Sequence, residues 1–321
     1  MQNAAASAHV YGDPEGFVLR EALAAYHAAR GFPVRLENIV LGAGADDLLC
    51  LIVRTVIDAG DKVVMSAGGY PTFAFHAAAH GGVLVTVPYR DDRNDCEALA
   101  AAARAAGARL VYLCNPDNPT GSWVGAAEQH RLLDALPEDC LLVLDEAYAD
   151  FAPEDAIPET DREDPRLIRV RTFSKIFGMA GARIGYGIAA EALIRNAEKI
   201  RNHFAVSRMA QDGALAALGD TEFRDFVRLE VESGRAEYAA LAIGLGLVPL
   251  PSATNFVAID MGTEARAQAT LDAMQRQEGI FIRKPGVAPL SRCIRVTVGL
   301  PEERRFFAEA LTRVVGKLDS A

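Results

Sequence analysis

Short apolar runs alternate with amphipathic stretches over most of the first 205 residues, and this alternation limits the fold more than any other feature of the chain. The apolar runs have the length and residue types of buried strands, and the stretches between them place apolar residues at helical spacing. Strands that take turns with helices build a parallel sheet covered by helices on both faces. The sequence therefore predicts an α/β domain around a large, mostly parallel, seven-stranded sheet.

The individual elements follow from the same patterns. Strands are expected at residues 38–41, 62–65, 83–87, 110–113, 141–144 and 167–172. Helices are expected at residues 17–30, 46–59, 73–80, 96–106, 126–135 and 191–204.

The pattern changes after residue 204. A long helical stretch at 209–245 precedes short strands near 256–260, 281–283 and 294–298 and a final helix at 301–318. Few strands with segregated helices indicate a smaller α+β domain. We therefore expect a short leader at residues 1–10, a large domain at 11–205 and a small C-terminal domain at 206–321.

The charge balance limits the partners. The chain has 33 Lys and Arg against 43 Asp and Glu, a net charge of −10. An acidic chain is repelled by nucleic-acid phosphates and by anionic membranes, so small molecules are the expected partners. The longest apolar stretch, 238–248, falls short of the about 18 residues that a membrane span needs. The first residues lack the charged front and apolar centre of a secretory signal, so we expect a cytoplasmic protein.

Neither the cysteines nor the histidines predict a metal or redox site. The five cysteines are an odd number, widely spaced and without a Cys-x-x-Cys pair, which argues against disulfides and zinc. They are Cys50, Cys96, Cys114, Cys140 and Cys293. His76 and His80 lie one helical turn apart, but no third ligand is near them in the sequence. We therefore expect no metal.

Polar residues follow three of the predicted strands. Asp145 follows 141–144, Lys175 follows 167–172, and Asn118 lies in the turn after 110–113. The carboxyl edge of such a sheet is where α/β proteins bind ligands. Asp145 could instead cap the next segment, and Asn118 could belong to a plain turn. A lysine in a partly dry pocket has the lowered pKa that a Schiff-base nucleophile needs, whereas a surface lysine stays in solvent.

Residues 42–47, Gly-Ala-Gly-Ala-Asp-Asp, follow the strand at 38–41 and open a helix. Backbone N–H groups and the helix dipole at such a position can bind a phosphate. As a dinucleotide fingerprint the segment fails, because Asp47 stands where G-x-G-x-x-G requires glycine. The segment therefore favours phosphate binding and weakens the case for a dehydrogenase.

Four motifs together resemble a known family. Asn-Pro-Asp-Asn-Pro-Thr-Gly occupies 115–121, Asp-Glu-Ala-Tyr occupies 145–148, Ser-Lys occupies 174–175, and Arg183 stands eight residues after Lys175. Their order and gaps resemble the fold-type I pyridoxal-phosphate aminotransferases of class I and II, and most closely the histidinol-phosphate aminotransferases. The resemblance implies an aspartate-aminotransferase-like fold and pyridoxal 5′-phosphate as cofactor.

The resemblance also assigns roles to single residues. It implies that Lys175 forms the Schiff base with the cofactor aldehyde, that Asp145 pairs with the pyridine nitrogen, and that Tyr148 assists at the ring oxygen. A protonated ring nitrogen makes the cofactor an electron sink. The other implied cofactor-binding residues are Gly44, Ala45, Asp46, Tyr70, Asn118, Thr172, Ser174, Arg183 and Tyr11.

Substrate recognition and assembly are also implied by the resemblance. Arg295 matches the arginine that binds the substrate anion through two parallel N–H bonds, and Arg283 matches a second arginine near the substrate, although Arg283 could equally form a surface ion pair. Tyr11 resembles the tyrosine that reaches the neighbouring cofactor phosphate across a homodimer with shared active sites. The implied substrates are histidinol phosphate or a related amine as donor and 2-oxoglutarate as the 2-oxo acid.

Two alternatives keep the cofactor but change the function. A threonine-phosphate decarboxylase resembles the same subfamily and differs mainly in which Cα bond is held perpendicular to the ring. A noncatalytic sensor of cofactor or amine is the second, and the presence of Lys175, Asp145, Tyr148 and Arg295 argues against it.

Overall fold

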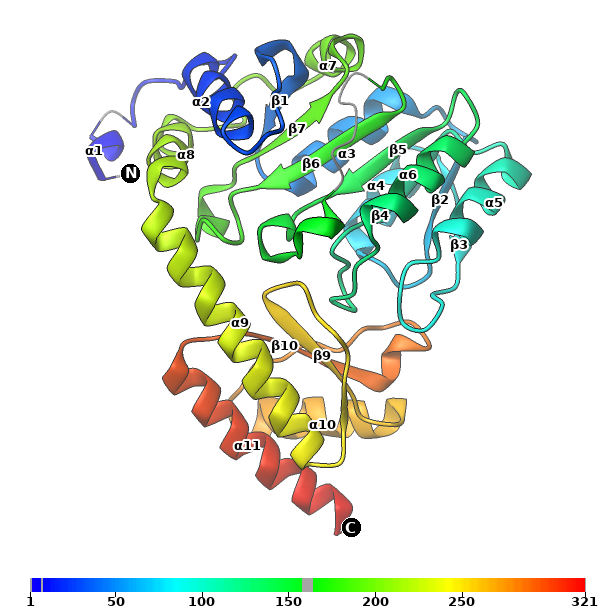
Figure 1. Ribbon diagram of the computed structural model, residues 1–321, viewed down its shortest axis with the longest axis vertical. Helices are drawn as coiled ribbons and strands as arrows, with labels where there is room; N and C mark the ends of the chain where they lie inside the picture. The colour runs from blue at the N-terminus through cyan, green and yellow to red at the C-terminus, as the bar shows by residue number, and fades with distance from the viewer. Residues whose placement is uncertain (1, 7, 158–163, 321) are drawn as a thin grey trace.

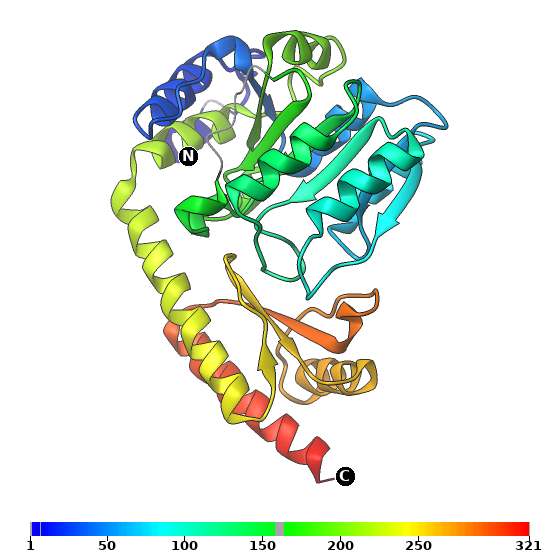
Figure 2. The same ribbon diagram turned by 45° about the vertical axis from the view of Figure 1, so that its right-hand side comes forward.

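In the part of the chain that the structure describes, two sheets are connected by one long helix. The structure, a computed structural model, describes residues 2–6, 8–157 and 164–320. Within these ranges the strands form one sheet of seven strands and one of three, and the helix at Thr221–Gly244 runs from the first to the second (Figure 1 and Figure 2).

The elements of the larger sheet come first in the chain. The strands of this sheet are β1 (Ile39–Gly42), β2 (Lys62–Ser66), β3 (Val83–Val87), β4 (Leu110–Cys114), β5 (Leu141–Asp145), β6 (Leu167–Thr172) and β7 (Gly185–Ala189). The helices before and between them are α1 (Gln2–Ala5), α2 (Phe17–Ala28), α3 (Ala45–Val56), α4 (Pro71–Ala79), α5 (Cys96–Ala106), α6 (Ala126–Ala135) and α7 (Glu191–Glu198).

The remaining elements follow the larger sheet. The helices are α8 (Arg208–Gly219), α9 (Thr221–Gly244), α10 (Glu264–Gln277) and α11 (Pro301–Asp319), and the strands are β8 (Val248–Pro249), β9 (Phe256–Asp260) and β10 (Cys293–Thr297).

The larger sheet is mostly parallel, as predicted. Its strand order among the described residues is β1-β7-β6-β5-β4-β2-β3. The neighbouring strands in the stretch β6-β5-β4-β2-β3 are all parallel to one another. Among the described strands of this sheet, β7 alone runs antiparallel to two neighbours, β1 and β6. Parallel strands that end together bring the residues after β4, β5 and β6 to one edge.

Helices cover both faces of this sheet. Buried side chains of α3, α4 and α7 pack on one face, and those of α5 and α6 pack on the other. On this second face α2 and α8 cover the part made by β1 and β7. The α/β architecture predicted from the alternating pattern is therefore confirmed.

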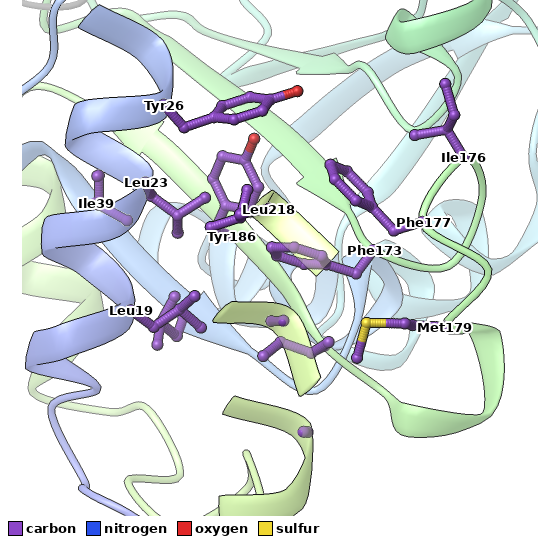
Figure 3. Packing of buried hydrophobic residues seen from close by; sticks show 14 of the residues in the cluster. Leu19, Leu23, Tyr26, Ile39, Phe173, Ile176, Phe177, Met179, Tyr186 and Leu218 are labelled. Carbon is purple, nitrogen blue, oxygen red and sulfur yellow. The ribbon is translucent and has the colours of Figure 1, made fainter. Parts of the chain in front are cut away.

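An aromatic cluster connects α2 to the segment after β6. Figure 3 shows Leu19, Leu23 and Tyr26 of α2 facing Phe173 and Phe177 of that segment. Phe173 and Phe177 have ring centroids 4.7 Å apart, and both side chains are buried. Because an aromatic side chain buries a large apolar area, this packing holds the segment firmly against the sheet.

The smaller sheet is antiparallel, with described strand order β10-β9-β8. Helices α9, α10 and α11 supply its core together with β9 and β10. The predicted boundary at 205/206 stays a prediction, and α8 just after it buries Ala210, Ala214 and Leu218 in the same cluster as α2.

Four expectations for the elements need correction. Strand β7 is absent from the predicted strands, because its sequence Gly-Tyr-Gly-Ile-Ala lacks the usual apolar pattern. Its glycines allow close packing of the backbone, since a Cβ on Gly185 would lie 2.7 Å from the Arg171 carbonyl oxygen. The predicted strand 281–283 is wrong, because only an isolated bridge joins Arg283 to Arg295. The helix predicted at 191–204 ends at Glu198, and the helical stretch 209–245 divides at Asp220, whose side chain caps α9.

A buried ion cluster lies beneath the edge where β5 and β6 end. The Glu146 carboxylate accepts hydrogen bonds from Arg169 Nε at 3.0 Å and Arg171 Nε at 2.8 Å. Burial by itself would raise the pKa of Glu146, but the two arginines outweigh burial and lower the pKa to about 2.

Over the described ranges, no helix combines the length and apolar character needed to cross a membrane.

Glu146 should make the free energy of unfolding depend on pH in the acid range. Its pKa falls from the ordinary 4.5 to about 2 on folding. A lowered pKa adds stability that is fully present above pH 4.5 and is lost as the pH falls through 2, on the order of 3 kcal/mol in total. Urea unfolding at a series of pH values measures this slope. Glu146→Gln should flatten it and also destabilise the fold, because two buried arginines lose their partner.

A matched control for this prediction is Glu191→Gln, which removes surface ion pairs with Arg195 and Arg35. Such exposed pairs contribute little, so the acid slope should remain. An unchanged slope in Glu146→Gln would contradict the assignment.

Candidate functional site

A cavity of about 180 Å³ lies at the carboxyl ends of β4, β5 and β6. Most of the cofactor-binding residues predicted from the sequence line it, although they come from distant parts of the chain. Its described lining is Ala45, Asp46, Tyr70, Cys114, Asn118, Asp145, Ala147, Tyr148, Thr172, Ser174, Lys175, Ala180 and Arg183. The topology of the sheet brings these residues together, because each ends a strand, lies in the segment after one or opens the helix that follows.

Asp145 is a buried carboxylate at the end of β5. It accepts hydrogen bonds from the Tyr112 hydroxyl at 2.7 Å and from the Ala147 backbone N–H at 3.0 Å. Burial raises the pKa of Asp145, and these two donors together with the charge of Lys175 oppose that rise. The carboxylate is thus held in one orientation with an oxygen at the cavity, where it can pair with a positively charged group.

Lys175 lies two residues before Phe177 in the segment that the aromatic cluster anchors (Figure 3). Its Nζ lies 4.9 Å from the centroid of the Tyr148 ring. Burial lowers the pKa of Lys175, and the Asp145 carboxylate partly restores it. A lysine with a lowered pKa can present an uncharged amine, as a nucleophile or proton acceptor must.

The beginning of α3 and Arg183 form a cradle suited to a phosphate. Arg183 Nη2 donates to the Ala43 carbonyl at 3.1 Å, and Nη1 lies 3.5 Å from Ser174 Oγ. Ser174 Oγ also accepts from the Thr172 hydroxyl at 2.9 Å. Hydroxyls, a guanidinium and the free N–H groups of a helix start are the donors that bind phosphate groups.

Gly44 is required in this cradle. Its φ of +93° is a conformation that other residues rarely adopt. A Cβ added there would overlap the Arg183 guanidinium, with Cζ at 2.8 Å. The backbone and the guanidinium therefore approach closely only because residue 44 has no side chain.

The loop that carries Asn118 is held by a second buried carboxylate. Asp117 accepts from the Tyr89 hydroxyl at 3.1 Å, from Asn94 Nδ2 at 3.2 Å and from the Thr120 hydroxyl at 2.8 Å. These bonds leave the neighbouring Asn118 amide at the cavity in a fixed position. The turn predicted from the two prolines is therefore rigid for an additional reason.

Arg295 connects the smaller sheet to this site. It lies on β10, its Nη1 donates to Asn118 Oδ1, and its Cζ lies 4.8 Å from the Phe256 ring centroid. Burial lowers the pKa of Arg295, and the nearby Arg283 adds to that effect. Arg283 does not line the cavity; its exposed guanidinium lies 5.0 Å from the Phe281 ring.

The structure separates Tyr11 from the cavity of its own chain and brings Tyr70 to it. Tyr11 is 79% exposed, and its ring centroid lies 4.8 Å from that of Phe204. Tyr70 immediately precedes α4 and lines the cavity, and burial raises the pKa of its hydroxyl.

His76 on α4 and His80 directly after that helix are engaged in other contacts. His76 Nε2 lies 3.2 Å from Asp46 Oδ1, and His80 Nδ1 lies 2.9 Å from the His76 carbonyl oxygen. Residues 2–6, 8–157 and 164–320 contain no group of three or more His, Cys, Asp or Glu arranged to hold a metal.

Sequence reasoning missed Tyr112, which positions Asp145. Tyr112 lies in the middle of β4, fully buried, and stacks on Phe73 with ring centroids 4.2 Å apart. The signal was present, because a tyrosine inside a buried apolar strand needs a partner for its hydroxyl. The sequence could not say which partner, since Asp145 is on a different strand.

The chain matches a known family over most of its length. Residues 1–311 match the family described as aminotransferase class I and II. The histidinol-phosphate aminotransferase of Maricaulis maris is 39% identical over 319 residues, which cover 97% of this chain and 86% of the relative. A second such enzyme, from Ralstonia nicotianae, is 38% identical over 318 residues, covering 97% and 82%.

A solved structure is also similar over nearly the whole chain. The histidinol-phosphate aminotransferase of Sinorhizobium meliloti, in complex with pyridoxal-5′-phosphate, is 48% identical with a TM-score of 0.95. The match covers 99% of this chain and 86% of that one.

Replacing Tyr112 by Phe should raise the pKa of Asp145 further. The hydroxyl donates to the charged form of Asp145, and a buried carboxylate that loses a donor is harder to ionise. Carboxyl-carbon NMR titration of the cofactor-free protein measures this pKa, and the free energy of unfolding should fall by about 1–3 kcal/mol.

The matched control is Tyr89→Phe, which removes the corresponding hydroxyl from Asp117. That variant should leave the Asp145 titration unchanged. If Tyr112→Phe also left it unchanged, Tyr112 would have no part in positioning the carboxylate.

Proposed function

Because this chain belongs to the aminotransferase class I and II family, we propose that it moves the amino group of histidinol phosphate, or of a related amine, to 2-oxoglutarate. The chain has the aspartate-aminotransferase-like fold and is a histidinol-phosphate aminotransferase-like enzyme. One observation carries the proposal: Lys175, Asp145 and Arg183 line the same cavity.

The cofactor of the proposed reaction is pyridoxal 5′-phosphate, and the residues present fit it. The absence of a side chain at Gly44 lets the Arg183 guanidinium approach the backbone at the start of α3, and this close pair of donors suits the phosphate. The buried carboxylate of Asp145 suits the ring nitrogen. When bound, this cofactor supplies an electron sink for bond breaking at the substrate Cα.

Several residues would hold the cofactor. Arg183, Ser174 and Thr172 would bind the phosphate together with the N–H groups of Ala45 and Asp46 at the start of α3.

The ring would be held by other residues of the same cavity. Tyr70 would stack on the ring, and the Asn118 amide and Tyr148 hydroxyl would donate to the ring oxygen. Asp145 would keep a proton at the ring nitrogen, because its carboxylate opposes loss of that positive charge.

Lys175 is the proposed residue for covalent attachment and proton transfer. Burial lowers the pKa of its ammonium, so its Nζ can accept a proton from the substrate Cα and return it. The Tyr148 ring beside Nζ limits the positions of the amine.

Arg295 is the proposed substrate-binding residue, with Arg283 as a more distant contributor. The guanidinium fork can bind the phosphate of the donor in one half-reaction and a carboxylate of the acceptor in the other. Arg295 is not among the described residues that line the cavity, but its bond to Asn118, which does line it, holds the guanidinium next to the cavity.

We also propose a homodimer with shared sites. Tyr11 is highly exposed and lines a different cavity from Lys175, which is the position expected of a residue contributed to a second copy.

The cysteines within the described ranges are all free, in keeping with a reducing compartment such as the cytoplasm.

Substrate assays test the proposed reaction. Wild-type protein loaded with pyridoxal 5′-phosphate should form glutamate from histidinol phosphate and 2-oxoglutarate. Carbon dioxide release from phosphothreonine without a keto acid would instead establish decarboxylation, and binding of amines without any turnover would establish a sensor.

Lys175→Ala should abolish turnover. Borohydride reduction followed by mass spectrometry should find the cofactor attached to residue 175 of the wild type and unattached in the variant. Retained turnover, or attachment at another lysine, would exclude Lys175 from the proposed role.

Gly44→Ala should weaken cofactor affinity by about tenfold or more, because the new Cβ displaces Arg183 from the phosphate cradle. Equilibrium dialysis against pyridoxal 5′-phosphate measures the affinity. Gly181→Ala is the matched control, since no atom lies within 4 Å of a Cβ there. Equal affinities in the two variants would refute the cradle.

A further inference from the structure

A second and larger cavity lies near the same sheet edge and takes no part in the function proposed above. Its volume is about 700 Å³, and it shares no described lining residue with the Lys175 cavity. It lies between α2, the start of α9 and the 3₁₀ turn at Ala149–Phe151. Arg169 and Arg171 of β6 line it, whereas Thr172 lines the Lys175 cavity, because side chains alternate between the faces of a strand.

The charged groups around this second cavity favour an anion. The arginines that line it are Arg30, Arg169, Arg171, Arg224 and Arg228, and the carboxylates on or behind its wall are Glu146, Asp150, Glu154 and Asp225. Arg228 is paired with Asp225 at 2.9 Å on the rim. The buried part therefore contains more guanidinium than carboxylate charge within the described residues.

Three of these guanidinium groups have donors to spare. Arg169 Nη1 and Arg224 Nη1 are buried and have no hydrogen-bond partner in the part of the chain that the structure describes. Arg224 is 7% exposed and makes no ion pair with any described residue; its Cζ lies 5.2 Å from the Tyr26 ring centroid. Arg171 uses Nε for its bond to Glu146. A buried donor without a partner costs free energy that a ligand oxygen can recover.

The positive charge of these arginines acts on the pKa values of two neighbouring side chains, His27 and Tyr26. His27 lines the cavity, and its pKa is lowered to about 3 by burial first and then by the charges of Arg171 and Arg169. Burial and Asp150 raise the pKa of Tyr26, and Arg30, Arg224 and Arg171 all act to lower it. Arg30, which follows α2, and Arg224 of α9 place their Cζ atoms 3.6 Å and 5.2 Å from the Tyr26 ring centroid, so guanidinium groups from distant parts of the chain lie beside this ring.

We propose that this cavity is a second ligand site that binds a small phosphomonoester. Arg169 has only Nη1 left beside its two bonds to Glu146, and together the spare N–H groups of Arg169, Arg171 and Arg224 match the several oxygens of a phosphate better than the two of a single carboxylate. The volume leaves room for an organic part against Phe32 and Tyr26. Asp145 lines the Lys175 cavity and the adjacent Glu146 holds the arginines, so a ligand here lies directly behind the Lys175 site.

Calorimetric titration of the cofactor-loaded protein with glycerol 3-phosphate, at constant ionic strength, tests the proposal. Inorganic phosphate and acetate serve as comparison ligands. We expect one saturable site that persists in Arg295→Gln, where the Lys175 site has lost its substrate arginine, and that weakens about tenfold or more in Arg224→Gln. Arg195→Gln, which removes an exposed arginine elsewhere, should bind like the wild type.

Several outcomes would overturn the proposal. These are the absence of saturable binding in the wild type, binding that is lost in Arg295→Gln but kept in Arg224→Gln, and acetate binding as tightly as the phosphomonoester. Inorganic phosphate that binds as well as glycerol 3-phosphate would reject the contribution of an organic part. Melting curves check that Arg224→Gln folds; if it does not, the exposed Arg30→Gln variant, which changes the same cavity, carries the same expectations.

Discussion

The attraction between a buried carboxylate and a buried amine is the interaction on which the candidate site depends. Burial raises the pKa of Asp145 and lowers that of Lys175, so each group is harder to charge alone than beside the other. Apolar strands exclude water on both faces of the sheet, and Tyr112 and Ala147 replace part of the lost hydration. A dry but hydrogen-bonded site of this kind suits proton transfer, because the groups need little rearrangement to react.

The short segment between β6 and β7 connects this pair to everything around it. Phe173 and Phe177 anchor the segment to α2 (Figure 3). Lys175 lines the cavity, and Arg183 at the end of the segment donates to Ala43 at the start of α3. One anchored segment thus carries both the proposed nucleophile and the proposed phosphate ligand. Strand β6, which precedes this segment, carries Arg169 and Arg171 on the other face of the sheet, and this places the second cavity next to the first.

Much of this arrangement could be predicted from local patterns. The alternation of strands and helices predicted the larger sheet, and residues after β4, β5 and β6 had to meet at one edge because those strands are parallel. Strand β7 could not be recognised, because its glycines allow close packing but leave no apolar periodicity. The segment 281–283 has the residue types of a strand, but in the structure only the bridge between Arg283 and Arg295 forms there.

The sequence by itself determined the fold class, the family resemblance and most of the polar residues that line the candidate cavity, since each of these depends on periodicity or on motifs a few residues long. Only the tertiary structure decided which distant groups meet. The Tyr112 hydroxyl on Asp145, the Arg295 guanidinium on Asn118 and the arginines around the second cavity join elements that are far apart in the chain. Such pairings depend on strand order and on helix packing over a sheet face, and neither leaves a local signal in the sequence.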